Sequence, residues 1–167
     1  TLTSSAVVVD WTTVDAAPSG TTYAGTLTVP QGGWYTMQAR ARDGAGVVLA
    51  SADGTNRWGV GINVLCIGQS NMVGNGDAVF TPAGDHVSLY ATAWSKLVDP
   101  WSGPTGGASP GPALGNPLHA ATQLPIGLVY WAAGASAMVP PGGGAWGYRN
   151  ASNPSDQTTN YGKALSR

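Results

Sequence analysis

Charge is scarce in this sequence. Asp, Glu, Lys and Arg make up 9% of the 167 residues, and the formal net charge is -1. Ordinary soluble domains carry about 25% charged residues. Without an excess of Lys and Arg, the chain offers no electrostatic footprint for the phosphates of a nucleic acid or for an anionic membrane. We therefore predict that nucleic acid is not a partner.

Cysteine and long hydrophobic runs are also lacking. The single cysteine, Cys66, excludes an internal disulfide and a metal site built from several cysteines. The stretch Gly142-Gly143-Gly144 is not followed by the Lys-Ser or Lys-Thr of a phosphate-binding loop. No run of about 18 apolar residues occurs, so we predict no membrane span. We expect no metal and no cofactor.

Glycine, proline and tryptophan are plentiful, with 25, 12 and 7 residues. The glycines and prolines predict many turns and little long helix, and the 43% hydrophobic share allows a packed core. An indole ring usually lies against a core, an interface or a sugar. Low charge combined with many Thr and Gly residues is typical of secreted or virion-surface β proteins. We expect an extracellular location, or a place on the surface of a phage-like particle.

Residues 1–61 contain several short strand-like runs. Residues 6–9 are apolar, and residues 22–29 are rich in β-branched and aromatic side chains. Two further runs, at 34–41 and 47–50, flank the turn at 43–46 and predict a β-hairpin. This hairpin resembles the penultimate hairpin of an immunoglobulin-like or fibronectin-like sandwich. We expect residues 1–61 to form a β-sandwich-like module.

The hydrophobic pattern changes after Gly61. Residues 62–67 and 126–131 are nearly continuous apolar runs, as in strands buried on both faces of a parallel sheet. Between them, Asn116 is a good N-cap and Pro117 suits a first helical position, so a helix is predicted from there to about Gln123. Together these elements predict a right-handed βαβ crossover.

Two other segments flank this crossover. The Gly- and Pro-rich residues 74–115 predict a long functional loop, and residues 160–167 predict the start of another helix. The whole chain is therefore predicted to be α/β. A β module at 1–61 precedes an α/β domain at 62–167.

The most specific local signal is Gly68-Gln69-Ser70-Asn71-Met72, directly after the first apolar strand. A serine there lies at the carboxyl end of a parallel sheet, where ligands of open α/β sheets bind. The backbone N–H groups of Ser70 and Asn71 can face a developing oxyanion. The alternative is a turn that caps a helix without any chemistry.

This block resembles the first motif of SGNH esterases, in particular the branch of sialate O-acetylesterases and acetylxylan esterases. Three further stretches are similar to family segments and follow in the same order: Val98-Asp99-Pro100-Trp101, Gly111-Pro112-Ala113-Leu114, and Pro125 to Val129 followed by Ala133 to Met138. The resemblance covers roughly residues 60–140. It implies that residues 62–167 are the N-terminal part of a three-layer α/β/α, flavodoxin-like SGNH domain.

The resemblance also implies roles for individual residues. Ser70 matches the nucleophile and one oxyanion donor, and Gly111 matches the glycine whose N–H is the second donor. Gln69, Asn71 and Gly134 are expected to contact substrate. Trp101 and Trp146 lie in Gly/Pro-rich loops and are expected to stack on a sugar ring, with packing within the protein as the alternative.

The family's general base, the histidine of an Asp-x-x-His segment, has no counterpart in the sequence. A serine hydroxyl is a poor nucleophile without such a base. We read His86 as an exposed loop histidine, and His119 as a partly buried or capping histidine within a helix. The base is therefore expected from the remainder of a longer polypeptide or from another chain, which would also complete the sheet.

The resemblance implies a carbohydrate O-acetylesterase, a serine hydrolase that removes acetyl esters from a glycan or polysaccharide. The alternative is a non-catalytic glycan-binding or virion-surface component with an esterase-like fold, and a third reading is a degenerate esterase half without activity. A homo-oligomer is one way to supply the missing partner chain.

Overall fold

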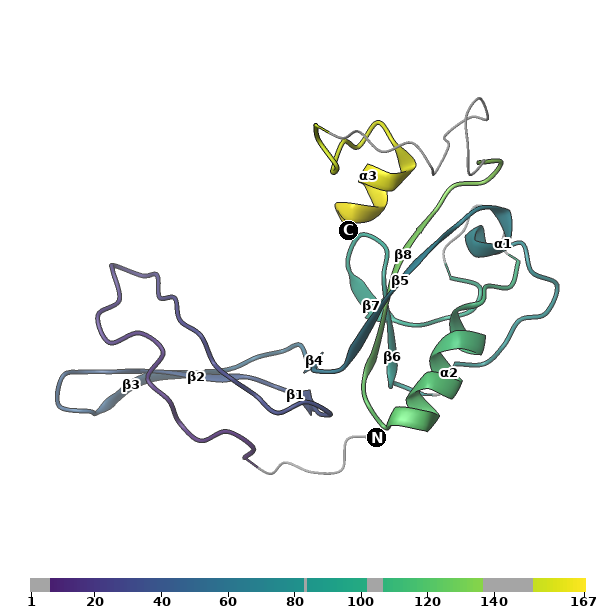
Figure 1. The fold of residues 1–167 in the computed structure, drawn as a ribbon. Coiled ribbons are helices and arrows are strands. Elements are labelled where there is room, and N and C mark those ends of the chain that lie inside the picture. The colour runs from purple at the N-terminus through teal and green to yellow at the C-terminus, as the bar shows by residue number, and fades with distance from the viewer. Residues whose placement is uncertain (1–6, 83, 102–106, 137–151) are drawn as a thin grey trace. The chain divides into compact units, whose positions relative to one another are not determined.

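The computed structural model describes residues 7–82, 84–101, 107–136 and 152–167. It divides into two compact units, Thr1–Val60 and Gly61–Arg167. Figure 1 shows the elements of both. Strands predominate and helices are few, so the chain is mixed α/β as predicted.

The first unit contains two small antiparallel sheets. Strand β1 (Trp34–Tyr35) pairs with β4 (Trp58–Gly59), and β2 (Gln38–Arg42) pairs with β3 (Val48–Asp53). The turn between β2 and β3 is held by the Asp43 carboxylate, which accepts hydrogen bonds from the N–H groups of Ala45 and Val47. The predicted hairpin is confirmed.

The predicted β-sandwich does not form in the described part of this unit. Residues 23–29 are irregular, and so are residues 7–9 of the first predicted strand. A sandwich buries the facing sides of two sheets, whereas none of the described residues 7–60 is buried. The strand prediction at 22–29 was wrong because β-propensity expresses a fit to a half-buried surface. Tyr23 and Leu27 are exposed here and have no such surface.

The second unit is built on a four-stranded sheet. Its strands are β5 (Ile62–Gly68), β6 (Val87–Tyr90), β7 (Trp94–Lys96) and β8 (Ile126–Ala132), in the order β5-β8-β6-β7. Strand β8 runs parallel to both β5 and β6, and β7 is antiparallel to β6. The two predicted apolar strands are thus confirmed as parallel neighbours.

The strand order differs from the predicted flavodoxin-like arrangement. In that arrangement the first strand lies between the second and the third. Here β8, the third parallel strand along the chain, lies between β5 and β6, and β5 pairs on one edge only within the described residues. The difference arises from the pairing of β6 with β8, which no local sequence pattern specifies.

The segment 74–115, predicted as a loop, contains β6, β7 and the beginning of a helix. Val87 and Leu89 are buried while Ser88 and Tyr90 are half-buried. The sequence alternates in the same way, Val-Ser-Leu-Tyr, but this period-2 signal covers only four residues and lies among glycines and prolines.

Helix α2 (Gly111–Thr122) begins five residues before the predicted Asn116. Pro117 lies inside the helix instead of at its first position. The earlier start brings Gly111, Pro112 and Gly115 into the packed interface, and that burial outweighs the N-cap preference of Asn116. The end is close to the prediction, because Gln123 adopts a left-handed conformation and its N–H bonds to the His119 carbonyl.

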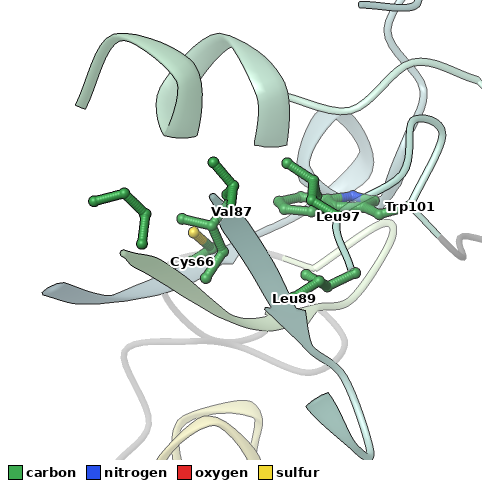
Figure 2. Packing of buried hydrophobic residues seen from close by; sticks show 7 residues of the cluster. Cys66, Val87, Leu89, Leu97 and Trp101 are labelled. Atoms are coloured by element: carbon green, nitrogen blue, oxygen red, sulfur yellow. The ribbon is translucent and has the colours of Figure 1, made fainter. Parts of the chain in front are cut away.

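The hydrophobic core lies between the sheet and α2. It consists of Cys66, Val87, Leu89, Leu97, Trp101, Ile126 and Leu128 (Figure 2). On β5, Leu65 and Ile67 remain 46% and 44% exposed, so this strand is not buried on both faces as predicted. The final helix, α3 (Asn160–Leu165), packs on β8 and confirms the helix predicted there.

Candidate functional site

Ser70 follows the carboxyl end of β5, where the strand turns into the four-residue helix α1 (Ser70–Val73). The turn is tight: a Cβ on Gly68 would lie 2.8 Å from the Cβ of Met72. Ser70 is half-buried, so its hydroxyl is not sealed in the interior. The predicted position at the carboxyl edge of a parallel sheet is confirmed.

The side chain of Gln69 engages both polar groups of Ser70. Its Oε1 accepts the Ser70 N–H at 3.1 Å and the Ser70 hydroxyl at 2.8 Å. An oxyanion could use the Ser70 N–H only after Gln69 turns away. Asn71 is exposed, and its carbonyl accepts the N–H of Gly74 at 3.3 Å. Both residues thus flank the serine.

Trp101 contacts α1 and is fully buried among the core side chains (Figure 2). Its indole N–H donates to the Met72 carbonyl at 2.9 Å, and its ring packs on Tyr130 with centroids 4.6 Å apart. A buried ring has no free face for a sugar. The prediction of Trp101 as a sugar-contacting residue is therefore wrong, because the indole completes the core.

Gly111, the predicted second oxyanion donor, is the buried first residue of α2. Its N–H points to the Ser109 hydroxyl oxygen across 3.4 Å, a long and weak hydrogen bond. The same hydroxyl donates to Asp99 at 2.7 Å. The side chain that connects this glycine to the Ser70 turn is Trp101, since a Cβ on Gly111 would lie 3.0 Å from the Trp101 ring.

The Asp99 carboxylate organises the loop before α2. One oxygen accepts the N–H and O–H of Ser109, and the other accepts the Phe80 N–H at 2.8 Å. Partial burial alone would raise the pKa of this carboxyl, but the three hydrogen bonds outweigh it and hold the pKa below its ordinary value. Asp99 is ionised at neutral pH and ties residue 80 to residue 109.

Both histidines lie at the amino ends of the parallel strands, whereas Ser70 lies at their carboxyl ends. His86 precedes β6, and His119 bonds through Nδ1 to the Leu124 carbonyl at 2.7 Å, just before β8. Their rings stack 4.2 Å apart and nearly parallel, at 6°. A seven-residue strand such as β5 separates its two ends by about 20 Å. Neither imidazole can therefore act as the base for Ser70.

The stacking also decides the two histidine predictions. His119 has the partly buried, capping role expected of it, and that prediction is confirmed. His86 is half-buried against His119, so the prediction of an exposed loop histidine was wrong.

A cavity of about 380 Å³ opens near the carboxyl ends of the parallel strands, where Ser70 also lies. It is lined by Val73, Ala91, Thr92, Tyr130, Trp131, Ala132, Gly134 and Arg167. Val73 belongs to α1, and Ala132 pairs with Gly68, so the cavity adjoins the serine turn although Ser70 itself does not line it. Gly134 was expected to contact substrate, and the structure places it in this wall.

Trp131 and Arg167 are among the cavity residues that sequence reasoning missed. Trp131 ends the strand predicted to be buried on both faces, but it is half-buried, and its Nε1 is enclosed without a hydrogen-bond partner in the described part of the chain. The Arg167 guanidinium lies 4.7 Å from the centre of the Trp131 ring and donates to the Ala91 carbonyl. Nothing local marks Arg167, because only tertiary packing brings α3 to β8.

Trp146 lies outside the described residues. Within the described ranges, no three His, Cys, Asp or Glu side chains are grouped as they would be to hold a metal. None of the described helices has both the length and the apolar character needed to cross a membrane. Comparison with protein-family models, curated proteins and solved structures found no match for this chain.

Proposed function

We propose that this chain carries the nucleophile of a carbohydrate O-acetylesterase. One observation carries the proposal: Ser70 stands accessible on a tight strand-to-helix turn, at the carboxyl edge of parallel strands, beside a cavity at the same edge. The resemblance of the Gly-Gln-Ser-Asn-Met block to SGNH esterases supports the choice of chemistry. The reaction is hydrolysis of an acetyl ester on a sugar or polysaccharide.

In this proposal the Ser70 oxygen attacks the ester carbonyl while its proton passes to an imidazole. The base is a histidine outside these 167 residues, because both histidines of the chain lie at the amino ends of the strands, away from Ser70. The Ser70 N–H, released from Gln69, and the Gly111 N–H, released from Ser109, stabilise the oxyanion. Each donor lowers the barrier by about 2.7–4 kcal/mol. Water then frees acetate and regenerates the serine.

The experiment is hydrolysis of p-nitrophenyl acetate by the full-length protein and by Ser70→Ala. We expect the substitution to abolish release of p-nitrophenol. Ser51→Ala is the matched control, since Ser51 is an exposed serine on β3 in the other unit and should leave the rate unchanged. Undiminished turnover by Ser70→Ala would remove Ser70 from the mechanism.

A second candidate is glycan binding without catalysis, and two observations favour it. The described residues bring no histidine to Ser70, and Gln69 occupies the serine hydroxyl and N–H. The cavity next to Ser70 then holds a glycan that is not cleaved. Retention on an acetylated-polysaccharide matrix, with no acetate released by wild type, would select this function over the esterase.

A further inference from the structure

The helix that carries Ser70 is too short to be stable without contacts to the rest of the protein. Helix α1 has four residues, and isolated helices of that length are unstable in water. At its two ends, the Val73 N–H donates to the Gln69 carbonyl at 3.0 Å and the Gly74 N–H donates to the Asn71 carbonyl at 3.3 Å. The orientation of Ser70 therefore depends on contacts made to α1 from elsewhere.

Trp101 supplies such a contact through its one polar atom. The indole is completely enclosed, and its N–H donates to the Met72 carbonyl at 2.9 Å. Met72 is two residues after Ser70. A buried N–H that loses its acceptor costs free energy, so the bond fixes the carbonyl, and with it α1, relative to the indole.

The same ring also contacts the sheet and the start of α2, where Gly111 carries the second N–H proposed for the oxyanion. One face packs on Tyr130 of β8, with ring centroids 4.6 Å apart. The six-membered ring lies so close to Gly111 that an added Cβ would be 3.0 Å from it. Trp101 thus contacts α1, β8 and the N-terminus of α2.

We infer that Trp101 is a positioning residue, whose N–H bond to the Met72 carbonyl sets the placement of Ser70 relative to Gly111. The inference rests on the proposed esterase function and deepens it, since Trp101 touches no substrate and acts through α1. Misplacement of a reacting group by about 1 Å can cost roughly 100-fold in rate. Loss of this one bond should therefore lower turnover more than binding.

The decisive test removes the N–H and keeps the shape. Trp101 is replaced in the full-length protein by β-(3-benzothienyl)alanine, whose sulfur stands where the indole N–H was. We expect kcat for p-nitrophenyl acetate to fall by about tenfold or more, with KM changed by less than about threefold. An unchanged kcat in this folded variant would overturn the inference.

Two further variants separate positioning from stability. Trp101→Phe also lacks the N–H and should lose kcat at least as strongly. Val87→Ala is the matched control, because Val87 is equally buried in the same core but stands at the amino end of β6, away from Ser70. It should lower the melting temperature and leave kcat unchanged. An equal loss of kcat in Val87→Ala would assign the effect to stability and overturn the positioning role.

One measurement on the unmodified protein does not depend on folding of a variant. The Trp101 indole N–H should exchange with deuterium far more slowly than that of the exposed Trp94. Equal exchange would overturn the inference. Failure of the proposed function looks different: Ser70→Ala then retains turnover, whereas failure of this inference alone leaves Ser70→Ala inactive and the Trp101 variants fully active.

Discussion

At the scale of single residues, a few polar side chains fix the loops around Ser70. Asp99 does so by accepting three hydrogen bonds with its two oxygens, and Gln69 does so by holding the serine itself. The Asp99 contacts join positions 10 and 19 residues away, whereas Gln69 contacts its neighbour in sequence. A change at either residue therefore alters the loops without touching the strands beneath them.

Asp99→Asn should destabilise the protein by about 1–3 kcal/mol at pH 7, because the amide NH₂ must face one of the donors that the carboxylate accepts. The folded-state pKa of Asp99 is depressed. Its contribution is therefore present above the unfolded pKa of about 3.9 and is lost as pH falls through the folded pKa. Urea unfolding of both proteins at pH 7 and pH 3 measures this.

The difference between wild type and Asp99→Asn should be largest at pH 7 and shrink toward pH 3. Asp77→Asn, at an exposed position, is the control and should change the unfolding free energy by less than about 0.5 kcal/mol. A difference that stays constant or grows on acidification would contradict the role of the ionised carboxylate.

Cys66 should be chemically inert in the folded protein. It is 3% exposed, and burial raises the pKa of its thiol to about 11. The thiolate is the reactive form, so little of it exists near pH 8. We expect iodoacetamide to leave native protein unmodified at pH 8 and to alkylate it fully in guanidinium chloride, as read by intact mass. Rapid labelling of the native state would show that the core around Cys66 opens.

At the scale of elements, close packing of α2 on the sheet decides where that helix begins. Gly115 faces Val87, and a Cβ at position 115 would lie 2.6 Å from Val87 Cγ1. The buried glycines of α2 let the helix approach β6. That approach accounts for a helix starting at Gly111 instead of at Asn116, whose side chain suits an N-cap but here donates a hydrogen bond to the Thr81 carbonyl.

Gly115→Ala should destabilise the protein although alanine is the better helix former. The propensity gain is about 1 kcal/mol, and overpacking a core contact costs about 1–3 kcal/mol. We expect a net loss of about 1 kcal/mol in chemical denaturation. Adding Val87→Ala removes the clashing methyl groups, so the double variant should be less destabilised than the sum of the single ones. Simple additivity would show that the helix shifts to avoid the contact.

At the scale of the whole molecule, the two units differ in how much they bury. All seven residues of the core cluster belong to the second unit, whereas none of the described residues 7–60 is buried. Two-stranded sheets without a buried face are marginally stable in water. Among the described residues, the hydrophobic core that stabilises the protein therefore lies in the second unit.

Residues 61–167 should fold without the first unit. We expect this fragment to keep a melting temperature within about 4 °C of that of the whole chain, because it contains the complete described core. Thermal melts followed by near-ultraviolet circular dichroism would show this. A fragment that fails to melt cooperatively would mean that the first unit contributes to stability despite its exposed residues.

Features that depend on neighbouring residues could be predicted from the sequence alone. Continuous apolar runs marked β5 and β8, and the glycine-rich turn at 43–46 marked the β2–β3 hairpin. The Gly-Gln-Ser-Asn-Met block marked Ser70 at a strand end. Each rests on local spacing or turn chemistry, which needs no knowledge of the remaining chain.

The order β5-β8-β6-β7, the burial of Trp101 and the distance of both histidines from Ser70 depend instead on how the chain packs in three dimensions. Trp101 lies in a segment rich in glycine and proline, and such a segment does not indicate whether the indole lies at the rim of the site or in the hydrophobic core. Its environment depends on residues 29 positions away, at Met72 and Tyr130. Contacts between distant segments depend on the packing of the whole chain, so the local sequence pattern cannot predict them.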